Sequence, residues 1–261
     1  MIKISGVRKS YGKKITLENI NLMLPKGKVI ALIGPNGAGK STLLSLIARL
    51  EKPDYGTIHL EGQNTASIPL RTFSKKLSFL KQQNVYDLKL RVSELIAFGR
   101  FPHSEGKITQ LDRDKIEEVI SLFDLSDIRN SFIDQISGGQ RQRVFLAMII
   151  AQDTDYILLD EPLNNLDMKH SRAIMALLSQ LAHEFHKTII TVVHDINFAA
   201  NFSDYCIAMK NGEIHYFDET RLLIRKEVLE ALFDMEFEVI SNASTLLCNY
   251  FYKTTPLKII S

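Results

Sequence analysis

One short stretch of this chain combines closely spaced glycines with a lysine and two hydroxyl side chains. It fits the pattern G-x-x-x-x-G-K-S and comprises Gly34, Pro35, Asn36, Gly37, Ala38, Gly39, Lys40, Ser41 and Thr42. Glycines let successive backbone N–H groups converge on phosphate oxygens, and a helix that starts there adds its dipole. The lysine of such a loop reaches the β and γ phosphates of a nucleotide, and the serine hydroxyl ligates Mg²⁺. A plain glycine turn is the alternative, and a chance match in this length is about one in a hundred.

A pair of carboxylates, Asp160 and Glu161, ends the apolar run Tyr156–Leu159. Adjacent residues of a strand point to opposite sides, so the two carboxylates need not share one task. Asp160 is the candidate Mg²⁺ ligand, and Glu161 is the candidate base that orients and deprotonates an attacking water. Alone, the pair fits a solvated strand end before Pro162 equally well. A phosphate loop in the same chain favours the catalytic interpretation.

A second glycine-rich turn precedes a run that is expected to form a helix from Arg141 to Ala151. It consists of Ser137, Gly138, Gly139 and Gln140. Small residues at a helix start present backbone N–H groups, so this turn is a second candidate anion site. On its own it would more often be a capping sequence. Because the chain already has one phosphate loop, the spare site would suit a nucleotide held by a partner.

Three buried strands are expected to position these residues. Val29–Ile33 is continuously apolar and ends at the glycine loop, and Thr188–Val193 repeats the pattern and ends at His194. The third strand is the apolar run before Asp160. Ligands of open α/β sheets gather at the carboxyl ends of such strands. The sequence therefore predicts an α/β fold with a parallel sheet, followed after the glycine loop by a helix from Ser41 to Leu50.

Two additions to that core are predicted. Alternation of Ile2, Ile4 and Val7, and then of apolar residues in 15–24, indicates an N-terminal antiparallel β subdomain. Helical periodicity indicates an inserted helical subdomain at about residues 84–146. We expect a single domain over residues 1–261, with a C-terminal extension at about 221–261 to which no motif assigns a role.

Composition excludes several classes of protein. The chain has 261 residues, of which 45% are hydrophobic, as expected for one large globular domain. Its 32 basic and 30 acidic residues give a net charge of +2, without the basic footprint that nucleic-acid binding needs. Cys206 and Cys248 have no metal-type spacing and are expected to be buried. The apolar run 144–151 is far shorter than the roughly 20 residues that cross a bilayer, so we expect a soluble chain.

The ordered set of motifs resembles the nucleotide-binding subunit of an ATP-binding-cassette (ABC) ATPase. Residues 34–42 match its Walker A motif, 136–140 its signature motif and 157–161 its Walker B motif. The resemblance covers about residues 2–220. It extends to Gln82 as the Q-loop glutamine and to residues 164–167 as the D-loop. His194 corresponds to the switch histidine, and Tyr11 to the aromatic residue that stacks on adenine. Asn164 and Asn165 stand where the D-loop commonly has Ser-Ala.

This resemblance implies a P-loop NTPase fold with ATP and Mg²⁺ as cofactors. It implies that Ser41, Gln82 and Asp160 serve the metal, and that Glu161, His194 and Gln82 are catalytic. The Walker A residues, the signature residues and Tyr11 would bind ATP between two copies in a head-to-tail dimer. An integral membrane permease would be supplied in trans, a substrate-binding protein would be met only indirectly, and the ATPase would lie peripherally on the cytoplasmic face of the cell membrane.

Finer resemblance indicates an importer. Residues 94–103 and 163–170 look like those of translocating ATPases that serve iron(III)–siderophore uptake, and haem and vitamin B12 importers are near neighbours. An ABC ATPase of DNA repair or chromosome maintenance is the alternative from another class. It would require long coiled coils, zinc-binding cysteines or a basic surface, which this sequence lacks. A translation factor would need paired cassettes, and a switch GTPase would need an Asn-Lys-x-Asp motif.

Overall fold

The centre of the molecule is a mixed sheet whose buried strands lead to the predicted site. The computed structural model describes residues 1–81, 89–242 and 245–251, and these form a six-stranded sheet in the order β10-β9-β3-β8-β7-β6. All neighbouring pairs are parallel except β10 with β9. The strands are β3 (Val29–Ile33), β6 (Leu77–Leu80), β7 (Tyr156–Asp160), β8 (Thr188–Val192), β9 (Tyr205–Lys210) and β10 (Glu213–Glu219). The three predicted strands β3, β7 and β8 are confirmed, and all their residues are buried, as in a sheet covered on both faces.

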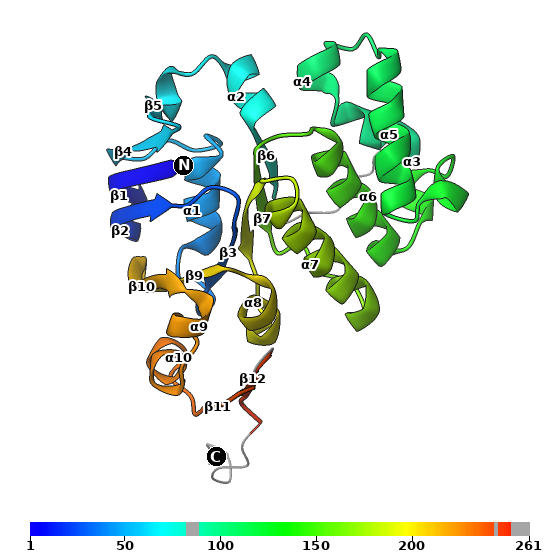
Figure 1. Cartoon of the computed structure of the whole chain (residues 1–261). Helices are drawn as coiled ribbons and strands as arrows, with labels where there is room; N and C mark the ends of the chain where they lie inside the picture. Colours follow the sequence, from blue (N-terminus) through cyan, green and yellow to red (C-terminus); the bar gives the residue numbers. More distant parts are fainter. Residues whose placement is uncertain (82–88, 243–244, 252–261) are drawn as a thin grey trace.

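The predicted N-terminal antiparallel sheet is also present. It has the order β2-β1-β4-β5, with β1 (Ile2–Tyr11), β2 (Lys14–Leu24), β4 (Tyr55–Leu60) and β5 (Gln63–Asn64). Helix α1 (Lys40–Ile47) packs between this sheet and the central one, because Leu43, Leu44 and Leu46 join one apolar cluster with residues of both sheets (Figure 1). The helix was predicted to reach Leu50 but ends earlier, where Arg49 adopts a left-handed conformation at φ +60°.

Helices α6 (Gly138–Ala151) and α7 (Met168–His183) cover one part of the opposite face of the central sheet (Figure 1). Helices α3 (Val92–Phe98) and α5 (Gln110–Leu122) pack on α6, α4 (Phe101–Ser104) lies beside α2 (Leu70–Lys76), and α2 precedes β6. Short 3-10 turns occupy Thr65–Ser67, Ser126–Ile128 and Ile133–Gln135. Buried Arg100 ties this group together, because its Nε lies 2.9 Å from Asp112 Oδ1 and its Nη1 donates a 2.7 Å bond to the Ala151 carbonyl.

The C-terminal part covers the rest of that face. It comprises α8 (Ile196–Phe202), α9 (Thr220–Leu223), α10 (Lys226–Phe233) and the hairpin β11 (Glu238–Ser241) with β12 (Leu246–Asn249). Two asparagines of α8 hold β12 by its backbone. Asn201 bonds to the carbonyl and N–H of Leu246 at 2.7 and 3.0 Å, and Asn197 bonds to those of Cys248 at 3.2 and 2.8 Å.

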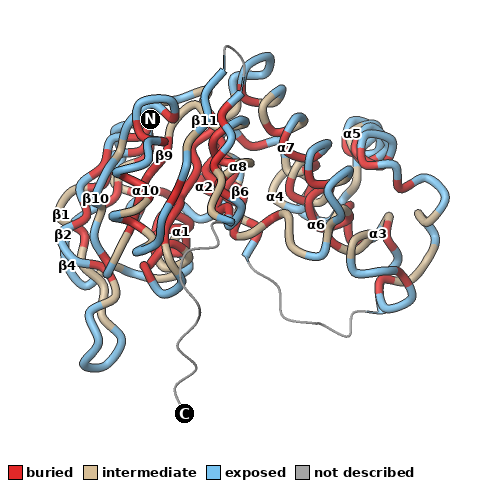
Figure 2. The backbone as a smooth tube through the Cα atoms, turned by 90° about the horizontal axis from the view of Figure 1, so that it is seen from below, coloured by how far each residue is buried: buried red, intermediate tan, exposed pale blue. Residues whose placement is uncertain are grey.

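Burial follows these layers. The central strands form the buried interior, whereas outer turns and the solvent-facing sides of helices are exposed (Figure 2). Cys206 and Cys248 are buried, as predicted. No helix within the described ranges has the length and apolar character needed to cross a membrane.

Candidate functional site

The glycine loop, residues 34–42, follows β3 and is here called the phosphate loop. Gly34 adopts φ +143°, and a Cβ there would lie 2.0 Å from the Met209 carbonyl oxygen on β9. Gly39 adopts φ +97°, and its Cβ would lie 2.9 Å from the carbonyl oxygen of Thr16. Glycine is therefore required at both positions, because neighbouring backbone approaches too closely for any side chain.

Lys40 completes the loop from its first helical position. Its buried ammonium donates hydrogen bonds to the carbonyl oxygens of Gly34 at 2.7 Å and Pro35 at 2.9 Å. Burial lowers the pKa of Lys40, and the nearby Glu161 and Asp160 carboxylates oppose that shift. The loop is thus closed by bonds among its own residues, with a cation at its centre.

Ser41 and Asp160 meet beside the loop. Ser41 Oγ donates a 3.0 Å hydrogen bond to Asp160 Oδ1, and Asp160 is only 2% exposed. Hydroxyl and carboxylate oxygens are hard ligands that suit Mg²⁺. In the described part of the chain, no cluster of three or more His, Cys, Asp or Glu residues could hold a metal. The pair therefore fits a cation that takes few protein ligands together with phosphate and water oxygens. Gln82, the third predicted metal residue, lies outside the described residues.

Glu161 follows β7 in a left-handed backbone conformation, at φ +54°. Strained conformations of this kind persist where surrounding contacts enforce them, often at functional sites. Its largely buried carboxylate is held at both oxygens. His194 Nε2 lies 2.6 Å from Oε1, and Asn164 Nδ2 donates a 2.7 Å hydrogen bond to Oε2.

One hollow of about 470 Å³ collects most of these residues. The phosphate loop from Asn36 to Thr42 lines it together with Glu161 and His194. The structure also places Lys14 and Thr16 of β2 in its wall. Sequence reasoning missed both, because they belong to no motif and reach the hollow only through the packing of the N-terminal sheet.

The signature turn, residues 137–140, caps helix α6. Ser137 N–H donates to Gln140 Oε1 at 2.9 Å, and Gln140 N–H donates to Ser137 Oγ at 3.2 Å, which is a capping box. Because Ser137 makes the helix start, α6 begins at Gly138 rather than at Arg141 as predicted. The turn is not among the residues that line the 470 Å³ hollow. Exposed Ser137 and Gly138 are therefore accessible to another molecule.

Tyr11 lies at the end of β1 and is 46% exposed. Its hydroxyl donates to a Glu51 carboxylate oxygen, and Lys9 Nζ lies 5.4 Å from the centre of its ring. Partial burial and Glu51 raise the pKa of Tyr11, whereas Thr42 of the phosphate loop opposes the shift. Tyr11 does not line the hollow.

Residues 161–166, which begin with Glu161, are here called the Glu161 loop. Helix α6 contacts this loop at two points. Buried Gln142 donates from Nε2 to the Pro162 carbonyl oxygen at 2.9 Å. Gly139 lies close to Asn165, whose carbonyl oxygen would stand 3.1 Å from a Cβ at Gly139. Sequence reasoning missed Gln142, since nothing local distinguishes it from the other polar residues of α6.

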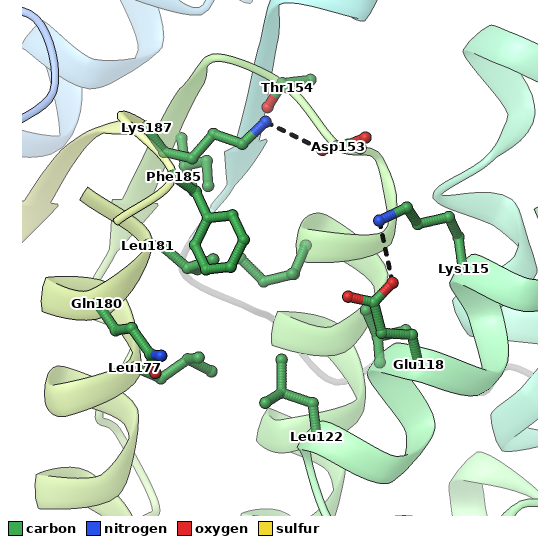
Figure 3. Close-up of a pocket in the computed structure, with 13 residues that line it drawn as sticks. Lys115, Glu118, Leu122, Asp153, Thr154, Leu177, Gln180, Leu181, Phe185 and Lys187 are labelled. Carbon is green, nitrogen blue, oxygen red and sulfur yellow. Dashed lines mark hydrogen bonds and ion pairs between the residues drawn. The ribbon is translucent and has the colours of Figure 1, made fainter. Parts of the chain in front are cut away.

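A separate apolar pocket of about 190 Å³ lies between α5, α6 and α7 (Figure 3). Leu122, Leu177, Leu181 and Phe185 line it, and the ion pairs Lys187–Asp153 and Lys115–Glu118 lie at its edge. Ile157, the first residue of the Walker B motif, lines this pocket, but the phosphate loop, Asp160 and Glu161 do not. Its apolar walls do not suit phosphates, so the nucleotide hollow remains the candidate site.

Comparison with known proteins agrees with this geometry. Residues 17–164 match the family described as ABC transporter. The petrobactin import ATP-binding protein YclP of Bacillus subtilis is 49% identical over 239 residues, covering 92% of this chain and 95% of YclP. The iron(3+)-hydroxamate import ATP-binding protein FhuC of the same organism is 36% identical, covering 90% of this chain and 88% of FhuC.

Solved structures of similar fold are also chains of ABC transporters or their ATP-binding cassettes. A dimeric ATP-binding cassette in a post-hydrolysis state, bound to ADP and Pi, matches with a TM-score of 0.77 and 33% identity, covering 85% of this chain and 99% of that one. A chain from an inward-facing ABC transporter of metal-chelate type matches with a TM-score of 0.81, covering 97% and 98%. At 24% identity, that second likeness bears on the fold alone. The predicted α/β P-loop NTPase fold is confirmed, and the chain belongs to the ATP-binding proteins of the ABC transporter family.

Proposed function

We propose that this chain hydrolyses ATP with Mg²⁺ in a head-to-tail dimer, and so powers import of an iron(III)–siderophore complex through a separate membrane permease. The observation that carries the catalytic part is the single hollow shared by the phosphate loop, Glu161 and His194. The import part is supported by relatives named for petrobactin and iron(3+)-hydroxamate import.

The phosphate loop binds the triphosphate through its backbone N–H groups. Lys40 would move its ammonium from the loop carbonyls to the β and γ phosphate oxygens, which offer full negative charge in place of carbonyl dipoles. Ser41 and Asp160 would hold Mg²⁺, which supplies charge stabilisation for the transferred phosphoryl group. We also propose Gln82 as a metal residue, and this assignment rests only on its match to the Q-loop motif.

Glu161 acts as the base in this proposal. Its carboxylate orients a water and takes a proton from it as the water attacks the γ phosphorus. His194 contacts Oε1 and lines the same hollow, so it can orient both the carboxylate and the terminal phosphate. Tyr11 would stack on the adenine ring from the end of β1.

The signature turn is proposed to act on the nucleotide of a second copy. Its position outside the chain's own hollow and its exposed helix start both support this role. The dimeric cassette of similar fold supports a dimer of this kind. Each of the two composite sites would then combine the phosphate loop of one subunit with the signature turn of the other.

The permease partner is inferred from the import relatives and from exposed apolar side chains on the helical region. Phe98 and Phe101 of α3 and α4 are 54% and 59% exposed, and Leu70 of nearby α2 is 71% exposed. We propose that this surface docks on the permease, which places the chain peripherally on the cytoplasmic face of the membrane. A substrate-binding protein would act on the far side of the permease, without contact with this chain.

The central test is Glu161→Gln in the assembled transporter. The variant keeps the shape of the side chain but cannot accept the proton, so turnover should fall by about 100- to 1000-fold while ATP still binds. Exposed Glu184, changed to glutamine in the same way, is the control and should leave turnover unchanged. Wild-type steady-state hydrolysis by Glu161→Gln would remove Glu161 from the base role.

The shared site has its own test. Ser137→Arg should leave nucleotide binding by the monomer intact and block hydrolysis. In a mixed dimer with Lys40→Ala, both defects fall on the same composite site, so the other site stays intact and retains activity that either variant homodimer lacks. A Ser137→Arg homodimer that is fully active in the transporter would exclude the signature turn from the partner's site.

The cargo is tested by uptake. Cells that depend on this chain for transport should accumulate iron from a ferric siderophore, and should lose that uptake with Glu161→Gln. Uptake of haem or vitamin B12 in place of the siderophore would overturn the cargo assignment and leave the ATPase assignment standing.

A further inference from the structure

The Asn164 amide contacts the proposed base but has no role in the function proposed above. Its Nδ2 donates to Glu161 Oε2 at 2.7 Å, opposite the oxygen that faces His194. We propose that Asn164 is a positioning residue, which fixes the Glu161 carboxylate in the orientation from which it takes a proton from water. This inference rests on the proposed function, since it requires Glu161 to be the base.

Glu161 needs such support because it stands between two hollows. A second hollow of about 240 Å³ lies beside the nucleotide hollow, and Leu163, Leu166 and Phe198 contribute apolar walls to it. Glu161 and His194 line both hollows, whereas Asn164 lines the second and not the first. A glutamate side chain has several rotatable bonds, so its carboxylate could turn toward either space. A hydrogen bond to Oε2 from the second hollow restrains that rotation.

The chemistry of an amide suits this task. Asn164 is a neutral donor, so it stabilises an ionised carboxylate without adding a charge or competing for the proton. An ionised carboxylate has about four lone-pair directions. That number exceeds the bond from Asn164 and the contact with His194, so neither of these two contacts excludes a hydrogen bond from water.

Asn164 is itself held in place. Its backbone N–H donates to the Glu161 carbonyl at 3.3 Å, and Leu166 N–H donates to the Leu163 carbonyl at 3.2 Å. The bond from Gln142 to the Pro162 carbonyl joins this short turn to helix α6. The amide is therefore presented by a bonded turn, and a positioned group of this kind can hold a reacting side chain within a narrow range of angles.

The test compares Asn164→Ala and the nearly isosteric Asn164→Asp with wild type in the assembled transporter. Asn164→Ala should lower kcat about tenfold, because the base loses its fixed orientation. Asn164→Asp should lower kcat further, because a second carboxylate repels Glu161. KM and the Kd for ATP should stay within about twofold of wild type, since the phosphate loop is unchanged. Asn130→Asp on the helical region is the control for the added charge and should match wild type.

A double-mutant cycle shows whether Asn164 acts through Glu161. Asn164→Ala should not lower the residual single-turnover rate of Glu161→Gln any further. A tenfold loss in that background too would mean that Asn164 acts independently of the base, and would overturn the proposal. Melting temperatures check that each protein is folded, and Asn164→Asp replaces Asn164→Ala in the cycle if the alanine variant does not fold.

The two proposals fail in different ways. If Glu161→Gln turns over ATP at the wild-type rate, the base assignment fails and the role of Asn164 fails with it. If Glu161→Gln is impaired while both Asn164 variants keep wild-type kcat, the proposed function stands and the positioning role of Asn164 is wrong.

Discussion

The phosphate loop and the Glu161 loop differ in what holds them. The phosphate loop is closed from within, since Lys40 bonds to the carbonyl oxygens of Gly34 and Pro35 in the same loop. The Glu161 loop also has bonds within its own turn, but groups that are distant in sequence hold it as well. His194 follows β8, and Gln142 comes from α6.

This difference separates a binding element from a catalytic one. A loop that makes bonds among its own residues keeps more of its shape when neighbouring elements move, which suits recognition of phosphates. A loop held by a helix and a strand end can change when those elements move. The position of Glu161 is therefore more open to control by the rest of the molecule than the shape of the phosphate loop is.

The largest expected effect comes from crowding the self-contained loop. Gly34→Ala places a Cβ 2.0 Å from the Met209 carbonyl oxygen, so backbone must shift and the free energy of unfolding should fall by about 3 kcal/mol or more. Gly37→Ala is the matched control. It has no atom within 4 Å of its Cβ and bears only the left-handed strain at φ +80°, about 1 kcal/mol. Urea denaturation measures both, and equal losses would contradict the close approach to β9.

Lys40→Ala tests the loop's function apart from its fold. Removing a charge that contacts phosphates should weaken ATP binding about 10- to 100-fold, while the glycines still shape the loop. Nucleotide titration at matched salt and Mg²⁺ measures this, with exposed Lys52→Ala as the control. Unchanged affinity would remove Lys40 from the phosphate site.

Gln142→Ala tests whether the hydrogen bond from helix α6 to the Glu161 loop matters for catalysis. Loss of the bond to the Pro162 carbonyl should lower kcat about fivefold, with ATP affinity unchanged. Gln152→Ala removes a similar bond, 2.7 Å long, from the other end of α6 to the Ser74 carbonyl. Both variants should lose about 1 kcal/mol of stability, but only Gln142→Ala should slow hydrolysis. An equal loss of kcat in both would show a general effect of α6.

The smallest effect concerns how the free energy of unfolding depends on pH through Asp112 of α5, which packs on the helix that follows the signature turn. Hydrogen bonds from Thr109, with Arg100 adding to them, lower the pKa of Asp112 to about 2. Since the folded pKa lies below the ordinary value, Asp112 stabilises the fold above about pH 4 and loses that contribution as the pH falls through about 2. Asp112→Asn should be less stable at neutral pH, and its deficit should shrink between pH 4 and pH 2. Exposed Asp114→Asn is the control in urea titrations at several pH values, and a deficit independent of pH would contradict this account.

The contrast between the phosphate loop and the Glu161 loop also explains which features could be predicted from the sequence. The phosphate loop, β3, β7 and β8 were predictable because their signals are local, namely a glycine pattern and continuous apolar runs that end in polar residues. Ser41 and Asp160 were both expected at the metal because ligands gather at the carboxyl ends of parallel strands, and the hydrogen bond between them was not predicted. The early end of α1 at Ile47 was not predictable, because it depends on the left-handed conformation of Arg49.

Other features depend on packing between distant segments. Lys14 and Thr16 enter the hollow only because the N-terminal sheet packs beside α1. Gln142 acquires its partner only after α6 meets the Glu161 loop, and the bond from Asn164 to Glu161 forms only when that loop folds into its turn. No spacing rule connects Gln142 with Pro162, and the short spacing from Glu161 to Asn164 does not by itself show that their side chains meet, so both supports were visible only in three dimensions.

The asparagine pair of α8 has a consequence for solubility. A strand with free N–H and C=O groups on its outer side is a template for another strand, and proteins protect such edges against aggregation. On β12 these outward groups belong to Leu246 and Cys248, and the amides of Asn201 and Asn197 bind all of them. The side chains of one helix thus take the place of a missing strand, which closes an edge that could otherwise recruit a second copy of the chain.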